Sequence, residues 1–214
     1  MPITEPGVYQ LPMADYLADP ALSCSGARKL LPPSCPALYQ HYVQHGEEAK
    51  AEWDFGSSAH TFILGTGPSV TVVKADNWTT KAAREERDAA RAEGSTPVLL
   101  NEWNRVQDMA EVLSAHLYAM QLLSTPGQAE SSLFWTDPVT DVMRRARPDY
   151  LHADGEIIVD YKTCKAGHPK AIEAAMWSYG YYQSGAWYQD AVVALGLLEY
   201  WPEFVFIFQE KTAP

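Results

Sequence analysis

Residues 147–163 read Arg-Pro-Asp-Tyr-Leu-His-Ala-Asp-Gly-Glu-Ile-Ile-Val-Asp-Tyr-Lys-Thr, and this stretch decides the fold. The apolar run Ile157-Ile158-Val159 predicts a buried strand, and Asp154-Gly155 just before it is a turn signal. Side chains two residues apart in a strand share a face, so we expect Asp160 and Lys162 to project together. The end of this strand therefore presents a carboxylate and an ammonium at one site.

Asp149 lies one predicted turn upstream, directly after Pro148. A turn over residues 150–155 returns the chain and brings Asp149 next to Asp160. Two neighbouring carboxylates resist ionisation unless a cation neutralises them, and Mg²⁺ typically binds one or two carboxylates together with waters and phosphate oxygens. Such an ion polarises a phosphate and activates water, while Lys162 orients that water or stabilises developing charge. This pattern predicts phosphodiester hydrolysis.

The alternative for Asp160 and Lys162 is an exposed ion pair on a strand, which contributes little. We favour a functional site because Asp160 directly follows three apolar residues and a Pro-Asp pair lies one hairpin upstream. That combination is much rarer than either piece alone.

Apolar periodicity and turn signals around this stretch predict the remaining elements. We expect strands at 130–135 and 142–147, which form an antiparallel meander with the strand at 155–161. A long core helix is expected at 101–123, an aromatic-rich helix at 169–195 and a last strand within 199–209. Nearer the N-terminus the sequence predicts two short helices at 26–31 and from 36, a helix at 52–64, a strand at 70–74 and a helix at 79–93. The order indicates an α/β fold, with a mixed sheet flanked by helices.

The bulk composition bounds the class of protein. A chain of 214 residues favours one domain, and the net charge of −11 argues against non-specific coating of nucleic acid, although a local groove can still be basic. The sequence has no apolar run long enough for a membrane helix and no secretory pattern at its start. Three cysteines, Cys24, Cys35 and Cys164, have no metal-type spacing. We therefore expect a cytoplasmic protein without membrane contact, in the host cytoplasm if it is phage-encoded.

Arg147-Pro148-Asp149, followed by Asp160-Tyr161-Lys162-Thr163, resembles the core of the PD-(D/E)XK nucleases. The surroundings resemble the exonuclease VIII branch, the RecE-type phage recombination nucleases. Further segments that are similar to that branch are 6–9, 22–25, 36–39, 55–60 and 209–211. The resemblance implies one exonuclease domain over residues 1–214, with a helical part at about 1–125 and a nuclease core at about 126–211.

The resemblance also implies roles for individual residues. Asp149, Asp160, the backbone carbonyl of Tyr161 and His60 would be metal ligands, and Lys162 would be the catalytic lysine. The metal would be Mg²⁺, with Mn²⁺ able to substitute. Taken alone, His60 beside an apolar stripe is more often a buried, satisfied histidine, and the family context reverses that preference.

Glu130 opens the strand that leads toward Asp149 and matches an acidic family position that would orient a metal-bound water. An exposed glutamate at a strand start is the alternative. The segment 181–188 resembles the family's Gln-x-x-x-Tyr motif, although Gln183 and Tyr188 are five residues apart rather than four. Either one of them is displaced or Ser184 occupies the glutamine position. Gln183 and Tyr188 join the predicted catalytic set.

Arg147, Arg145 and Lys165 are the basic residues that we expect to contact DNA phosphates. The resemblance implies a nuclease that degrades linear double-stranded DNA from its ends, 5′ to 3′, and leaves 3′ single strands for an annealing partner of the RecT kind. A homo-oligomeric ring is also implied. The alternatives are an endonuclease or a single-strand or flap nuclease of the same superfamily, and a catalytically inactive DNA-binding module.

Overall fold

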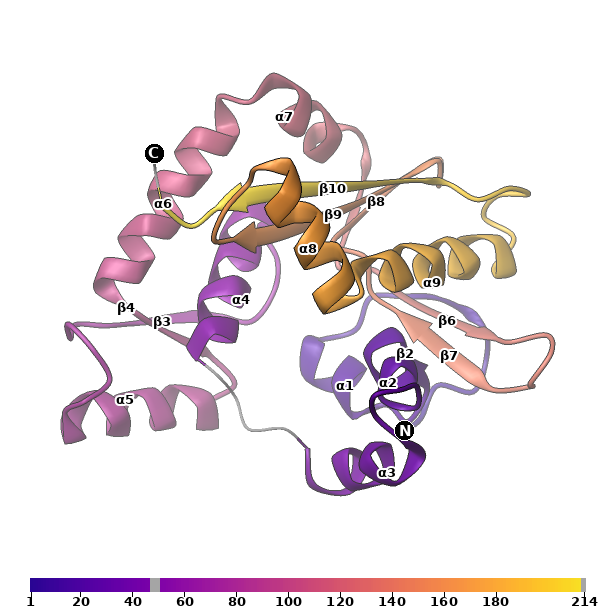
Figure 1. Ribbon diagram of the computed structural model, residues 1–214, viewed down its shortest axis with the longest axis horizontal. Coiled ribbons are helices and arrows are strands. Elements are labelled where there is room, and N and C mark those ends of the chain that lie inside the picture. Colours follow the sequence, from indigo (N-terminus) through magenta and orange to yellow (C-terminus); the bar gives the residue numbers. More distant parts are fainter. Residues whose placement is uncertain (47–50, 213–214) are drawn as a thin grey trace.

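The computed structural model describes residues 1–46 and 51–212, which form a mixed α/β fold (Figure 1). The first half of the chain contains β1 (Gly7–Tyr9), α1 (Met13–Ala18), β2 (Leu22–Ser23), α2 (Cys24–Lys29), α3 (Pro36–His45), α4 (Ala51–Leu64), β3 (Val70–Val73), α5 (Lys81–Ala92), β4 (Thr96–Leu99), α6 (Leu100–Ser114) and α7 (Leu117–Ser124). The second half contains β5 (Gly127–Ala129), β6 (Ser132–Thr136), β7 (Met143–Ala146), β8 (Tyr150–His152), β9 (Ile157–Cys164), α8 (Pro169–Tyr179), α9 (Tyr181–Ala194) and β10 (Glu203–Glu210). The predicted fold class is confirmed.

Two four-stranded sheets organise the molecule, and β3 and β4 form a separate parallel pair. One sheet has the order β1-β6-β7-β2 and the other has the order β10-β9-β8-β5. Between β5 and β8 the chain crosses from one to the other twice, between β5 and β6 at Glu130 and between β7 and β8 at Asp149. The two crossings touch, because the Glu130 amide donates to the Asp149 carbonyl at 3.1 Å.

The prediction of a single antiparallel meander is therefore wrong. β7 pairs with β6 and β2, whereas β8 pairs with β9 and β5. Pro148 lies between β7 and β8, has no amide to donate to a ladder, and so favours the end of pairing there. β10 then joins β9 in parallel, with Phe206 opposite Asp160 and Phe208 opposite Lys162.

Two predicted long helices are each divided. The helix expected at 101–123 is α6 followed by α7, and His116 starts the second by accepting the Ala119 amide at its Nδ1, 3.2 Å away. The helix expected at 169–195 is α8 followed by α9, and Gly180 separates them with a φ of 62°. This left-handed conformation suits glycine and ends α8.

The two faces of β9 pack against different layers. Tyr161 packs with Phe55 and Ala59 of α4, while Ile158 packs with Ala191 and Val192 of α9. α9 lies between the two large sheets, where it contacts β6, β7 and β10 (Figure 1). Because strand side chains alternate, Asp160 and Lys162 lie on the same face as Ile158, toward α9. Within the described ranges, no helix is both long and apolar enough to cross a membrane.

Candidate active site

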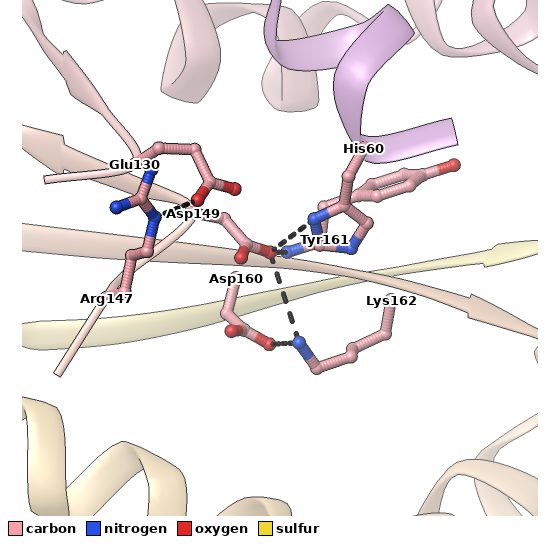
Figure 2. Close-up of polar contacts among 7 residues, drawn as sticks. All are labelled: His60, Glu130, Arg147, Asp149, Asp160, Tyr161 and Lys162. Carbon is pink, nitrogen blue, oxygen red and sulfur yellow. Dashed lines mark hydrogen bonds and ion pairs between the residues drawn. The ribbon is translucent and has the colours of Figure 1, made fainter. Parts of the chain in front are cut away.

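The second half of β9 brings Asp160 and Lys162 to one point (Figure 2). The Lys162 ammonium forms an ion pair with Asp160 Oδ2 and lies 4.0 Å from Asp149 Oδ2. The Tyr161 amide donates to Asp149 Oδ2 at 2.7 Å, which fixes that carboxylate against the strand. Asp160 is only 2% exposed and Asp149 is also buried. Lys162 is thus held between two buried carboxylates.

A candidate metal-binding cluster adjoins this group. His60, Glu130 and Asp149 each offer one ligand atom, and these atoms lie within 4.8 Å of one another. His60 comes from α4, and its Nδ1 lies 3.5 Å from Asp149 Oδ2 (Figure 2). Two carboxylate oxygens and one imidazole nitrogen suit a divalent cation. Of the predicted metal ligands, this cluster of described residues contains His60 and Asp149, together with Glu130. Asp160 instead forms an ion pair with Lys162.

Burial controls the electrostatics of the site. It raises the pKa of both Asp149 and Asp160 to about 6, although Lys162 acts to lower both values. Burial lowers the pKa of His60, and Lys162 lowers it further, so the imidazole is neutral and keeps a lone pair for a metal. Burial alone would lower the pKa of Lys162, but Asp160 and Asp149 raise it above its usual value.

The charges present also favour a cation. Three buried carboxylates, Glu130, Asp149 and Asp160, face the two positive groups Lys162 and Arg147. One negative charge remains in a region of low solvent access, and unbalanced buried charge is costly. A divalent ion at the His60, Glu130 and Asp149 atoms would offset it, so the donor set fits a divalent metal.

Glu130 has an unusual backbone conformation for a non-glycine residue, with a φ of 56°. It lies in the turn just before β6 rather than within a strand, and it is buried. The Arg147 Nε donates to Glu130 Oε2 at 2.5 Å, and another nitrogen of the same guanidinium donates to Ser132 Oγ and to the Leu11 carbonyl. Strained residues of this kind concentrate at functional sites, where the surrounding structure holds them.

Two of the residues predicted to contact DNA are turned into the protein. Arg147 binds Glu130, and the Arg145 guanidinium donates to the Tyr16 carbonyl and lies 4.7 Å from the Tyr16 ring. Arg147 therefore positions Glu130, and Arg145 positions α1. Both guanidinium groups have little surface left for a phosphate. Lys165, just beyond β9, is exposed, and its contact with DNA stays a prediction.

The predicted Gln-x-x-x-Tyr segment lies on α9. Burial raises the pKa of Tyr188, and the charges of Asp160 and Asp149 add to this rise. Its ring lies 6.0 Å from that of Phe204 on β10. Gln183 instead lies beside Gly180, where a Cβ added to the glycine would approach Gln183 Oε1 to 3.0 Å. Ser184 accepts a long hydrogen bond from the Cys24 thiol.

Tyr181 was not predicted as a site residue, yet its ring centroid lies 5.5 Å from Lys162 Nζ. It opens α9 directly after Gly180 and contacts the rings of Phe206 and Phe208 on β10. The sequence contains one signal for it: Tyr181 and Tyr188 are seven residues apart and so share one face of a helix.

A hollow of about 280 Å³ borders the metal-binding cluster. His60 and Glu130 line its inner side, and Met13 and Leu17 of α1 form an apolar wall. Thr61 on α4 adds a polar group. The cluster is thus reachable from a cavity large enough for water and small groups.

Two buried acids, Glu130 and Asp149, lie at the crossings between two sheets, and Asp160 and Lys162 lie two residues apart on β9. This arrangement defines a nuclease-type α/β fold. A family model described as a PDDEXK-like domain of unknown function (DUF3799) matches residues 23–214. The chain belongs to this family, and the predicted PD-(D/E)XK membership is confirmed. No curated protein matches the chain.

Proposed function

We propose that this protein is a Mg²⁺-dependent DNA exonuclease that hydrolyses linear double-stranded DNA from its ends. The observation that carries the proposal is the Lys162 ammonium held between Asp160 and Asp149, beside the cluster of His60, Glu130 and Asp149. Mn²⁺ is expected to substitute for Mg²⁺, because both ions bind carboxylate oxygens and waters.

The side chains of the site have separate tasks. His60, Glu130 and Asp149 would hold the metal, which when bound polarises a phosphate and acidifies water. Lys162 is fully charged because of its two carboxylate neighbours, and it donates to the attacking water or to a phosphate oxygen. Asp160 fixes the direction of the lysine through their ion pair.

Glu130 accepts a hydrogen bond from Arg147 at Oε2. This contact orients the carboxylate so that its other oxygen faces the cluster and can accept a hydrogen bond from water. Tyr188 would supply a protonated hydroxyl, because burial raises the pKa of this phenol and keeps its proton in place. The residues thus provide one positive donor, one orienting acid and a neutral hydroxyl around the reacting phosphate.

The 5′ to 3′ direction, the 3′ single-stranded product and its use in recombination by strand annealing are proposed from the likeness to RecE-type nucleases. A RecT-type annealing protein would then be the partner, and a homo-oligomeric ring would hold the DNA. The matched family model supports the nuclease fold that such a role requires.

The test is a cleavage assay with purified protein, Mg²⁺ and labelled duplex DNA. We expect linear duplex to shorten from its ends, with a dependence on the 5′ phosphate, while closed circular duplex stays intact. Lys162→Ala should abolish cleavage, and Lys74→Ala, which removes an exposed lysine at the end of β3, should not. Nicking of the circle would instead indicate an endonuclease. DNA binding without any cleavage would indicate an inactive binding module.

A further inference from the structure

Aromatic side chains gather where α8 meets α9. Trp177 is 68% exposed, Tyr179 is 60% exposed and Tyr182 is 46% exposed. The rings of Trp177 and Tyr182 lie 5.0 Å apart, and Tyr179 stacks on Tyr181 at 5.5 Å with an interplanar angle of 29°. We call these four residues the aromatic surface. Aromatic rings of this size normally lie buried, so a group of three exposed ones marks a binding surface.

The aromatic surface is continuous with the candidate active site. Tyr181 joins the two, because its ring stacks on Tyr179 and also faces the Lys162 ammonium at 5.5 Å. A ligand that lies across Tyr179 is therefore one aromatic ring away from the lysine. This placement connects the surface with the substrate of the site rather than with a distant partner.

The backbone at Gly180 creates this arrangement. Its left-handed φ of 62° turns the chain between α8 and α9, so aromatic residues from two helices meet at one corner. Arg28 of α2 fixes the corner, because its guanidinium donates to the Tyr179 carbonyl. A Cβ at Gly180 would lie 2.7 Å from Arg28 atoms, which shows how closely this side chain packs there.

The charge of this region differs from that of the whole chain. Residues 160–190 contain three lysines, Lys162, Lys165 and Lys170, and three acidic residues, Asp160, Glu173 and Asp190, so this stretch is neutral although the chain carries a net charge of −11. Lys165 and Lys170 are exposed, and Lys170 lies two turns before Trp177 on α8, with Glu173 between them on the same face of that helix. Flat neutral rings beside lysines match a single nucleic-acid strand, whose bases stack and whose phosphates are negative.

We propose that the aromatic surface binds unpaired bases of single-stranded DNA by stacking and guides that strand to or from Lys162. This inference rests on the proposed nuclease function and adds a substrate feature to it, an unpaired strand next to the cleaved bond. A duplex hides its base faces in its own stack, so the surface selects a frayed end or a single-stranded product.

Binding in the absence of metal tests the inference without cleavage. We would measure the fluorescence anisotropy of a labelled oligothymidylate with the full chain in EDTA, and of an abasic strand of the same length. Trp177→Ala, Tyr179→Ala and Tyr182→Ala should each weaken binding of oligothymidylate by about fivefold to a hundredfold, the value of one lost base stack. Trp177→Phe and Tyr179→Phe keep the ring and should retain most of the affinity.

Matched controls separate stacking from general loss of aromatic side chains. Tyr118→Ala and Trp201→Ala remove rings that are 58% and 62% exposed at other places and should leave binding unchanged. The wild type should bind the abasic strand more weakly than oligothymidylate. The alanine variants should bind the abasic strand as well as the wild type does.

Each outcome decides the matter. The inference is overturned if the wild type does not bind oligothymidylate, if the alanine variants bind it as the wild type does, or if they lose both strands equally. If the protein cleaves DNA but its alanine variants bind oligothymidylate as the wild type does, this inference alone is refuted. Ring-dependent binding by a protein that never cleaves DNA would refute the proposed function and leave the surface standing.

Discussion

Replacing Arg147 by methionine should strongly destabilise the metal-free protein. The Arg147 and Glu130 side chains are each 9% exposed and are joined by a contact of 2.5 Å. Methionine fills much of the space of the arginine stem but leaves the Glu130 carboxylate buried without its cation. Breaking a buried pair in this way costs about 3–5 kcal/mol. For a chain of this size, that corresponds to a fall in melting temperature of about 6–20 °C.

Urea unfolding in EDTA, followed by tryptophan fluorescence, measures this cost. The control is Lys81→Met, because the Lys81 and Glu85 side chains are 87% and 67% exposed and their pair should contribute less than about 1 kcal/mol. Adding Glu130→Gln to Arg147→Met removes the stranded charge and should restore a large part of the stability. If Arg147→Met alone unfolds within about 1 kcal/mol of the wild type, the pair is solvated and the account of Glu130 as a buried, positioned acid fails.

Three further predictions concern the same region. Lys162→Met should lower the rate of DNA cleavage by at least about 100-fold with the circular dichroism spectrum unchanged, because a charged donor is lost; a variant with wild-type turnover would contradict the role of the lysine. Mn²⁺ at about 100 times its Kd should stabilise the wild type by about 2.7 kcal/mol in a thermal unfolding assay, and Asp149→Asn should lose most of this gain; an equal gain in both proteins would place the metal elsewhere. Gly180→Ala should cost more stability than Gly94→Ala in urea unfolding, because both have positive φ but only the first would bring a Cβ within 2.7 Å of another side chain; equal costs would show that Arg28 moves aside freely.

The centre of the site was predictable because its signals are local. The apolar run before Asp160 indicates a buried strand, and the two-residue period places Lys162 on the same face, without any knowledge of the rest of the fold. The structure shows both features in β9. The proximity of Asp149 needed only one short turn, and the Tyr161 amide supplies the contact that holds it.

The surroundings of the site depend on distant contacts that no local pattern describes. Arg147 is bound by Glu130 and by the Leu11 carbonyl, so an arginine that reads as a phosphate contact is a buried support. The left-handed backbone of Glu130 is imposed by the crossing between sheets and is rarely adopted by a glutamate. β5 and β8 have three residues each, which is too short for an alternating pattern to stand out.

The divided helices illustrate a different limit. Apolar and aromatic residues continue with a helical period on both sides of Gly180, so periodicity predicts one helix where a single residue turns the chain. Gly180 itself was the available signal, since glycine at a helix end commonly takes the left-handed conformation. The aromatic surface exists only because that turn is made.

The two chain crossings between the large sheets have a mechanical consequence. Glu130 and Asp149 sit on these crossings and their backbones are hydrogen-bonded to each other, so the spacing of the two acids follows the angle between the sheets. A load that opens this angle would separate the acids, and an ion held by both would resist it. The protein would then stiffen as a whole when it takes up metal, with slower amide hydrogen exchange in β6 and β8 alike.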